Sequence, residues 1–247
     1  MAKPTNKPYE DNGDDKQNQN GDNEKNDDFS VNHRFGTVDA TAFEATPRQM
    51  YFGNGNSPDN YNVTDVAAFH LETGLKIHVR TGADIPPTGA QAGDGTEHYV
   101  APAGLQTGSI PLRAAWNFDY VVDTAVGSIP ITTQNTLGDF TFKMGISQSG
   151  PFLSPKTVIY DLNAATHIWI SETNPTHGFG GADDFTHAAS PALQSHLAEN
   201  SVNLGFLISD FGPLATSTAP GVSYDIKLSA YHGGDLISMT HDVILLA

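Results

Sequence analysis

A strict alternation of large apolar and polar side chains is the feature that most constrains this chain. In the segment 113–123, Trp116, Phe118 and Tyr120 occupy every second position, with smaller or polar residues such as Asp119 between them. A period of two is typical of a β-strand with one buried face. An aromatic face of this size needs a second layer to cover it, so the pattern predicts packed sheets.

The same alternation recurs in the segments 74–81, 139–147 and 222–231. Further strands are expected at 157–162 and 166–171, as the arms of a hairpin, at the short apolar segment 202–208, and at 236–246. Residues 163–165 are expected to turn the chain between two of these strands. The best-supported local prediction is the last hairpin, in which His232-Gly233-Gly234-Asp235 forms the turn. Only the segment 188–199 has a helical composition, with Ser190-Pro191 as N-cap and first helical residue.

About eight to ten short strands, separated by turn-rich stretches and accompanied by one helix, predict an all-β fold. We expect a β-sandwich, with the jelly-roll type preferred, as a single domain over residues 31–247. Residues 1–30 are dominated by Asn, Asp, Lys, Glu and Gln, and beyond Met1 only Tyr9 and Phe29 are large and apolar or aromatic. Such a segment cannot bury enough apolar surface to order itself, so it is predicted to be a disordered tail.

The charge balance excludes some classes of partner. Twenty-eight acidic residues face 12 Lys and Arg, which gives a net charge of −16, and the basic residues do not cluster. Nucleic-acid binding needs clustered cations, so no nucleic-acid partner is expected. No run of about 18 apolar residues occurs, so no membrane span is expected. An acidic surface suits solubility, divalent cations or cationic partners.

A segment rich in oxygen ligands lies between residues 54 and 65. Its candidate calcium ligands are Asn54, Asn56, Asp59, Asn62 and Asp65. Calcium binds six to eight hard oxygen atoms, which Asn and Asp side chains in a turning loop can supply. The spacing is not that of an EF-hand, and the other interpretation is that these residues only form turns. Two further acidic spots that could complete a calcium site are Asp183-Asp184 and Asp94 with Glu97.

No established catalytic motif occurs in the chain, which has no cysteine, no Gly-x-Ser-x-Gly and no His-Glu-x-x-His. Paired carboxylates for glycoside cleavage are remote in sequence, so they leave no local pattern. Asp119 and Glu172 are the first candidates, and the other interpretation is that both are outward polar residues of ordinary strands. Aromatic residues that could stack on sugars, or be buried in the core instead, are Tyr51, Tyr61, Tyr99 and Trp169.

The C-terminal residues Asp242-Val-Ile-Leu-Leu-Ala247 place an acidic residue before a hydrophobic run at the chain end. This ending resembles the terminal signal of bacterial type I secretion substrates, such as metalloproteases of the serralysin group. The resemblance implies export only, since that group's zinc motif and calcium β-roll are both missing. The N-terminal residues show no apolar region of a Sec signal peptide. We therefore expect an extracellular protein exported by the type I route.

A broader resemblance runs from Tyr51 to the end of the chain. It rests on four pieces, which are Phe52-Gly-Asn54-Gly-Asn56-Ser-Pro-Asp59, Trp116-Asn117-Phe118, Glu199-Asn200-Ser201-Val-Asn203-Leu-Gly205-Phe206 and the closing hairpin from Gly221 to Ala230. These pieces resemble uncharacterised bacterial extracellular β-sandwich proteins. The resemblance implies a fold and a location, and it supplies no activity.

Three functions are compatible with these observations. The leading hypothesis is a secreted, non-enzymatic structural or adhesive protein that self-assembles in a matrix, filament or surface layer, because strand edges can pair between subunits. The first alternative is a calcium-dependent carbohydrate-binding module. The second alternative is a glycan-active enzyme on a jelly-roll frame. The expected cofactor is calcium, and the expected partners are a second copy of the chain or a glycan.

Overall fold

The computed structural model describes residues 30–38, 59–80, 83–89, 94–108, 112–124, 126, 135–151, 153–162 and 197–247. These residues form two five-stranded sheets. Sheet A has the order β1 (Val31–Gly36), β2 (Tyr61–Val66), β3 (Leu71–Val79), β5 (Trp116–Asp123) and β8 (Leu197–Val202). Sheet B has the order β4 (Thr96–Ala101), β10 (Asp235–Leu246), β9 (Ser223–His232), β6 (Thr141–Gly150) and β7 (Leu153–Asp161).

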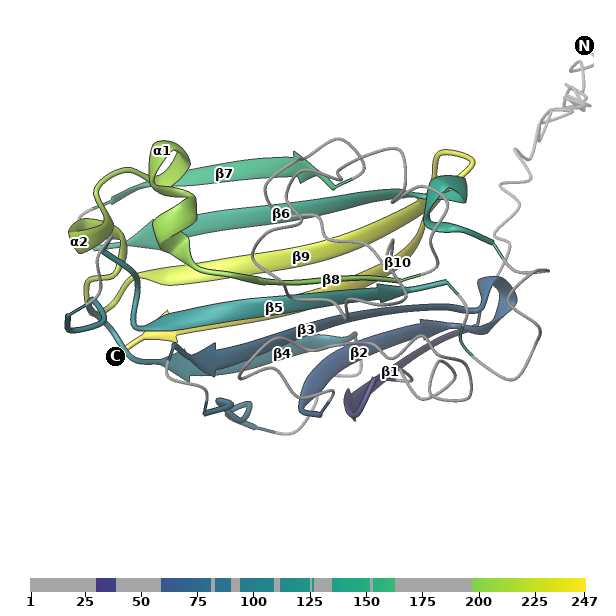
Figure 1. The fold of residues 1–247 in the computed structure, drawn as a ribbon, viewed down its shortest axis with the longest axis horizontal. Coiled ribbons are helices and arrows are strands. Elements are labelled where there is room, and N and C mark those ends of the chain that lie inside the picture. The colour runs from purple at the N-terminus through teal and green to yellow at the C-terminus, as the bar shows by residue number, and fades with distance from the viewer. Residues whose placement is uncertain are drawn as a thin grey trace, which may run out of the picture.

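All neighbouring strands are antiparallel except β4 and β10, which run parallel. The strands of both sheets follow the long axis of the molecule, and two short helices lie together at one end (Figure 1). These helices are α1 (Ile208–Phe211) and α2 (Leu214–Ser217). Short 3-10 helices span Ala67–Phe69, Leu137–Asp139 and Leu204–Phe206. The predicted all-β class is therefore confirmed, while the jelly-roll topology stays a prediction.

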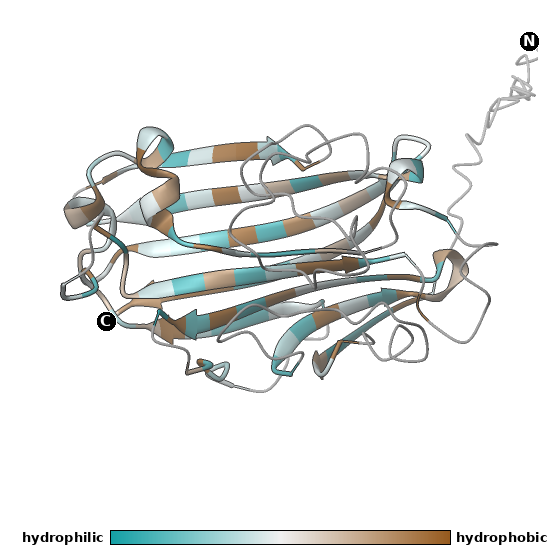
Figure 2. Ribbon diagram, in the orientation of Figure 1, coloured by the Kyte–Doolittle hydropathy of each residue, from teal (hydrophilic) through white to brown (hydrophobic). Residues whose placement is uncertain are grey.

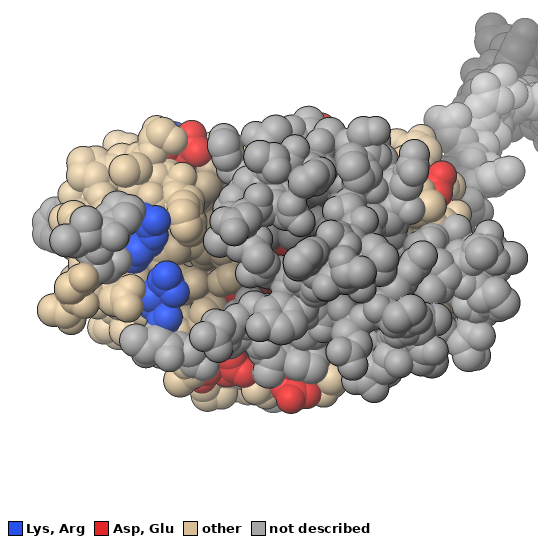
Figure 3. Space-filling view, in the orientation of Figure 1, with Lys and Arg blue, Asp and Glu red and all other residues tan. Residues whose placement is uncertain are grey.

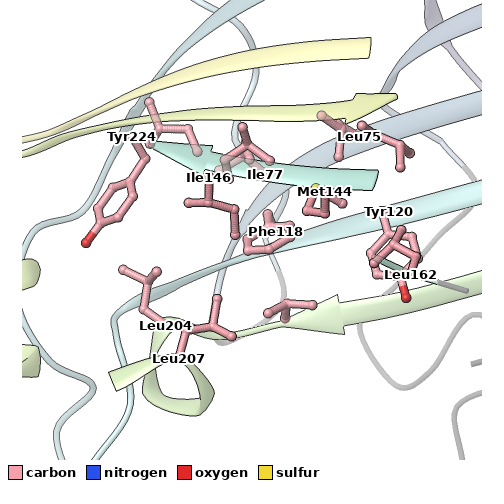
Figure 4. Close-up of a cluster of buried hydrophobic side chains, with 14 of the residues drawn as sticks. Leu75, Ile77, Phe118, Tyr120, Met144, Ile146, Leu162, Leu204, Leu207 and Tyr224 are labelled. Atoms are coloured by element: carbon pink, nitrogen blue, oxygen red, sulfur yellow. The ribbon is translucent and has the colours of Figure 1, made fainter. Parts of the chain in front are cut away.

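The core lies between the sheets and contains the aromatic face of β5. Trp116, Phe118 and Tyr120 are fully or almost fully buried. They belong to one cluster with Met144 and Ile146 of sheet B (Figure 4). Bands of apolar and polar residues alternate along the strands, as a period of two requires (Figure 2). Apolar burial on this scale is the main term that stabilises a sandwich.

A polar seam also crosses the interior where β2 and β3 face β10. We define this interior polar seam by the side chains Asn62, Thr64, Thr73, Ser238, Thr240 and Asp242, all buried. The hydroxyl of Thr73 lies 2.8 Å from those of both Ser238 and Thr240, which belong to the opposite sheet. Asn62 Nδ2 donates to Asp242 Oδ1 across the same gap at 2.9 Å. Hydrogen bonds therefore join the two sheets at this position, in addition to apolar packing.

The last hairpin is confirmed, with β9 and β10 joined at Gly233 and Gly234. Both glycines have positive φ, 62° and 101°, a region that side chains with a Cβ rarely occupy. The predicted strands 74–81, 113–123 and 139–147 correspond to β3, β5 and β6.

The predicted strand 202–208 is wrong, because β8 ends at Val202 and a 3-10 helix begins at Leu204. The side chain of Asn203 causes the change in direction. Its Oδ1 accepts hydrogen bonds from the backbone N–H groups of Gly205, at 2.8 Å, and Ala114, at 2.9 Å. An Asn side chain that satisfies the first N–H of a helical turn is a typical N-cap. The apolar run after Val202 is therefore helical.

Two further expectations are corrected in part. The end of the predicted helix 188–199 is wrong, because residues 197–199 belong to β8, and residues 188–196 lie outside the described part. The predicted strand 157–162 corresponds to β7, whose antiparallel partner is β6. The other arm predicted for its hairpin, 166–171, lies outside the described residues. Residues 1–29 also lie outside the described residues, so the disordered tail stays a prediction.

Candidate functional site

The outer face of sheet A, the face turned away from the core, carries buried ionisable side chains. Successive residues of a strand point to opposite faces, so Leu75 and Ile77 of β3 enter the core while Lys76 and His78 face outward. Asp119 faces outward from β5, between Phe118 and Tyr120. Charged residues are almost never fully buried unless they are paired, so this face is unusual for a sandwich.

Strand register brings these outward side chains together. Lys76 of β3 lies opposite Asp119 of β5. On the other side of β5, Ser201 of β8 lies opposite Asp119, and Glu199 lies opposite Val121. Glu199 is therefore the diagonal neighbour of Asp119. We call Lys76, His78, Asp119, Glu199 and Ser201 the outer-face cluster.

Asp119 lies at the centre of the outer-face cluster. Its Oδ1 is 2.9 Å from His78 Nε2, and its Oδ2 is 3.8 Å from Lys76 Nζ. Lys76 Nζ is also 3.6 Å from Asp84 Oδ1 and 4.8 Å from the centre of the Tyr61 ring. Lys76 and His78 thus face the two oxygens of a buried carboxylate, and removal of either partner would leave its charge poorly compensated.

The contacts of His78 indicate that its ring carries both protons. Its Nδ1 lies 2.9 Å from the carbonyl oxygen of Val79, and its Nε2 faces Asp119. A carbonyl oxygen and a carboxylate only accept hydrogen bonds, so each ring nitrogen must donate. Burial lowers the pKa of His78, but the hydrogen bond to Asp119 and the charge of Asp119 outweigh burial and raise the pKa overall. His78 is therefore suited to carry a positive charge beside Asp119.

Glu199 has the opposite preference. Burial and the nearby charge of Asp119 raise its pKa to about 8, although the charge of Lys76 acts in the other direction. Its Oε2 is buried with no hydrogen-bond partner among the described residues. At neutral pH this raised pKa favours the protonated form of Glu199. Two carboxyl groups whose environments favour different protonation states can serve as acid and base in one reaction.

A glycine makes the close packing of this face possible. A Cβ on Gly74 of β3 would lie 2.7 Å from Val121 Cγ1 and 3.1 Å from Tyr61 Cδ1. It would also lie 3.3 Å from Cγ1 of Val38, a residue that follows the end of β1. Val38, Tyr61 and Val121 thus pack into the space above Gly74, beside the outer-face cluster.

A second charged group lies at the β1 side of the same face. Arg34 donates from Nε to Asp65 Oδ2 at 2.8 Å and from Nη2 to Glu72 Oε2. A pocket of about 620 Å³ opens here, lined by Arg34, Thr37, Val38, Asp65, Val66, Ala67, His70, Leu71 and Val126. The pocket lies over β1, β2 and the start of β3, so it does not enclose the Asp119–Glu199 pair. Described acidic residues are visible along this edge in the space-filling view (Figure 3).

The predicted calcium loop is not brought together by its described residues. Asn54 and Asn56 lie outside the described part of the chain. Asp59 is exposed and accepts a hydrogen bond from Thr37 at 2.6 Å, and Asp65 pairs with Arg34. Asn62 points into the interior polar seam, on the opposite side of β2 from Asp65. Since Asn62 and Asp65 lie on opposite faces of β2, they cannot share one ion.

The other candidates have mixed outcomes. Asp119 is part of a charged cluster, but the expectation that it is exposed is wrong, because its side chain is 0% exposed. Tyr61 and Tyr99 are buried, so they do not offer a sugar-stacking surface in this conformation. The other candidates named from the sequence, Tyr51, Trp169, Glu172 and Asp183-Asp184, lie outside the described residues.

Lys76, His78 and Glu199 were not recognised as site residues from the sequence. Lys76 and His78 alternate with the apolar residues of β3, which is the ordinary pattern of a solvated strand face. Glu199 fell at the end of the predicted helix. In the sequence, the one indication of the outer-face cluster was that ionisable residues of both charge signs occupy the polar positions of β3 and β5.

Within the described residues, no three or more His, Cys, Asp or Glu side chains are arranged to hold a metal ion. No helix in that part of the chain has the length and apolar character needed to cross a membrane. No protein-family model matches the chain, and no curated protein sequence matches it significantly. Any functional conclusion therefore depends on the geometry of the site itself.

Proposed function

We propose that this protein is a glycan-active hydrolase whose acid–base pair is Glu199 and Asp119. The observation that carries the proposal is that two buried carboxyl side chains, Asp119 and Glu199, are diagonal neighbours on adjacent strands, where burial raises the pKa of Glu199 to about 8. Glycosidases commonly use two carboxyl groups about 5 to 9.5 Å apart, one to protonate the leaving group and one to act as base or nucleophile. Asp119 and Glu199 are diagonal neighbours on antiparallel strands, so both side chains leave the same face of sheet A.

The two carboxyl groups have distinct roles in the proposal. Glu199 is the general acid, because its raised pKa keeps a proton available at neutral pH. Asp119 is the base or nucleophile, and its carboxyl group is oriented by Lys76 and His78. Ser201 Oγ lies 3.3 Å from His78 Nε2, the same ring nitrogen that faces Asp119.

The proposal requires that a glycan reach two buried side chains. The side chains of Asp119 and Glu199 are 0% and 1% exposed. A glycan can reach them only if the outer face of sheet A opens. If water reached Glu199, its pKa would fall, and the ionised side chain would have no proton to donate at neutral pH. Substrate must therefore displace water as it enters.

The direct test is hydrolysis of a panel of neutral and anionic polysaccharides by the full chain, measured as release of reducing ends. Glu199→Gln and Asp119→Asn are expected to lower the rate at least about 100-fold, the usual contribution of a general acid or base. The rate should also fall as pH rises through the pKa of Glu199, about 8, because the acid is then lost.

Asp235→Asn is the matched control, since it removes a carboxylate from the exposed β9–β10 turn. It should leave the rate unchanged. Equal rates in the wild-type protein and in folded Glu199→Gln and Asp119→Asn variants would refute the assignment. Absence of hydrolysis across the whole panel would count against the enzyme class itself.

The self-assembling structural or adhesive role depends on free strand edges. β7 forms one edge of sheet B, and Ile159 on it is 66% exposed. The same strand contains Pro155 and Lys156, residue types that hinder edge-to-edge pairing. β7 therefore supplies no clear support for assembly, and this role stays a prediction, as does calcium-dependent carbohydrate binding.

Type I export also stays a prediction. The residues that carry that resemblance, Asp242 to Ala247, include the end of β10, which lies between β4 and β9. Ile244 and Leu246 are buried in the core. Their hydrophobic character is therefore already accounted for by folding. Detection of the protein in culture medium only when a type I transporter is present would support export.

A further inference from the structure

Two carboxyl groups lie side by side inside the sandwich, far from the outer-face cluster. Glu97 of β4 and Asp242 of β10 are register partners in the parallel pair of strands. They are 2% and 0% exposed. Neither has an ion pair with a Lys, Arg or His within the described residues. A buried carboxylate without a compensating positive charge is strongly unfavourable.

Asn62 of the opposite sheet fixes the geometry beside Asp242. Its Nδ2 donates to the carbonyl oxygens of Gly95, at 2.9 Å, and His241, at 3.0 Å, as well as to Asp242 Oδ1. Carbonyl oxygens only accept, so this set of contacts determines which end of the amide is nitrogen. The amide oxygen of Asn62 is left buried without a hydrogen-bond partner.

The side chain of Tyr99 lies on the same inward face of sheet B as these two carboxyl groups. Tyr99 follows Glu97 on the inward side of β4 and is 2% exposed. The hydroxyl has no hydrogen-bond partner in the described structure.

Four buried oxygen atoms here therefore have no hydrogen-bond partner within the described part of the chain, namely Asn62 Oδ1, Glu97 Oε1, Tyr99 OH and Asp242 Oδ2. They come from β2, β4 and β10, which meet at the interior polar seam. Buried polar atoms without partners are rare in native proteins, and a missing ion is one physical explanation for them. Two carboxylates supply two negative charges, which matches a divalent cation. Carboxylate, amide and hydroxyl oxygens are hard ligands, which calcium prefers.

We propose that Asn62, Glu97 and Asp242 bind a calcium ion between the two sheets, with the Tyr99 hydroxyl at its edge. The ion would replace the missing positive charge and join β2 of sheet A to β4 and β10 of sheet B. The site contains two carboxylates. It is therefore not a group of three or more His, Cys, Asp or Glu side chains, which the described residues do not contain. Bidentate carboxylates and water can complete the six to eight oxygens that calcium needs.

This site differs from the calcium loop expected from the sequence. Two of its ligands were named from the sequence. Asn62 was a candidate ligand of the predicted loop, and Glu97 belonged to an acidic spot that could complete a calcium site. It excludes Asp65, which lies on the other face of β2 and pairs with Arg34. It is independent of the proposed hydrolase, since it shares no residue with the outer-face cluster.

The competing explanation is that Glu97 and Asp242 are protonated and hold no metal. Asp242→Asn distinguishes the two, because it keeps the shape of the side chain and removes its charge. If a proton neutralises the pair, the variant should be no less stable than the wild-type protein, with or without calcium. If calcium does so, the variant should lose the response to calcium.

The test uses the full chain, freed of metal by a chelator and then titrated with calcium chloride while its melting temperature is measured. A ligand selective for the native state raises the melting temperature, and we expect at least about 4 °C at saturation. Asp242→Asn and Glu97→Gln should abolish that rise. Asp65→Asn, which removes a carboxylate from the predicted loop, is the matched control and should retain it.

Terbium bound to the wild-type protein provides a second readout besides the melting temperatures. It replaces calcium at oxygen sites and emits when a nearby aromatic ring is excited. Terbium bound to the wild-type protein should be displaced by calcium with one-to-one stoichiometry, and Tyr99→Phe should alter its emission. No melting shift and no calcium-displaceable terbium in the wild-type protein would overturn the proposal. A shift of equal size in Asp242→Asn would do the same.

Discussion

At the scale of single residues, Gly74 determines how closely side chains pack on the outer face of sheet A. Gly74→Ala would place a methyl group 2.7 Å from Val121 Cγ1, and Val121 is stiff because it is branched at Cβ. We expect the free energy of unfolding to fall by roughly 1–3 kcal/mol, the usual cost of overpacking. Chemical denaturation of the variant measures this directly.

Gly145→Ala is the control for that substitution. Gly145 also lies in a strand interior, on β6, but the nearest atom to its added Cβ would be 3.9 Å away. The exchange should be neutral or slightly stabilising, since Ala loses less conformational entropy on folding than Gly. Equal losses in the two variants would mean that the packing around Gly74 is not as close as described.

At the scale of elements, Asn203 ends β8 and starts the helical turn that follows it. Besides accepting from two backbone N–H groups, its Nδ2 donates to the carbonyl oxygens of Trp116, at 2.9 Å, and Ala114, at 3.1 Å. Asn203→Ala would leave several buried backbone groups without partners. We expect a loss of about 2–4 kcal/mol in the free energy of unfolding, measured by urea denaturation.

Asn32→Ala tests whether that loss is specific. Asn32 lies on the edge strand β1, is exposed, and makes one long hydrogen bond of 3.5 Å to Asp65. Its replacement should change the free energy of unfolding by less than about 0.5 kcal/mol. A similar small change in Asn203→Ala would show that the cap does not hold the chain at the end of β8.

The elements also show what could be read from the sequence. Strands such as β5 and the β9–β10 hairpin were predictable because alternation and a Gly-Gly turn are local patterns. The end of β8 was not, since the apolar residues after Val202 fit a strand or a buried helix equally well. Asn203 decided between them through contacts with residues near Ala114, 89 positions away.

At the scale of the whole molecule, the candidate sites depend on register between distant strands. His78 and Ser201 are in contact although 123 positions separate them, and Asn62 meets Asp242 across 180. Single-sequence patterns determine which face of a strand a residue occupies, but they do not determine which strands are neighbours. Asp119 was therefore a candidate from the sequence, whereas Glu199 and Asp242 were not recognised.

The raised pKa of Glu199 also has a consequence for the whole molecule. The unfolded chain releases this proton near the ordinary pKa of 4.5, whereas the folded protein keeps it up to about 8. Between these values the folded state binds more protons than the unfolded state, so stability falls as pH rises. Each unit of pKa difference corresponds to about 1.4 kcal/mol.

Glu199→Gln removes that proton-binding group. From pH 5 to pH 8, the wild-type protein should lose on the order of 3 kcal/mol more of its free energy of unfolding than the variant does. Denaturation at each pH measures the difference, and Asp235→Asn should follow the wild-type curve. Parallel curves for the wild-type protein and Glu199→Gln would contradict the raised pKa.

The most direct test of the acid–base pair is a carbon-13 NMR titration of the glutamate carboxyl groups. The Glu199 resonance is assigned by its absence from the spectrum of Glu199→Gln. The structure predicts that this resonance titrates near pH 8. Titration of the same resonance near the ordinary value of 4.5 would show that Glu199 is ionised at neutral pH, and the proposed general acid would be lost.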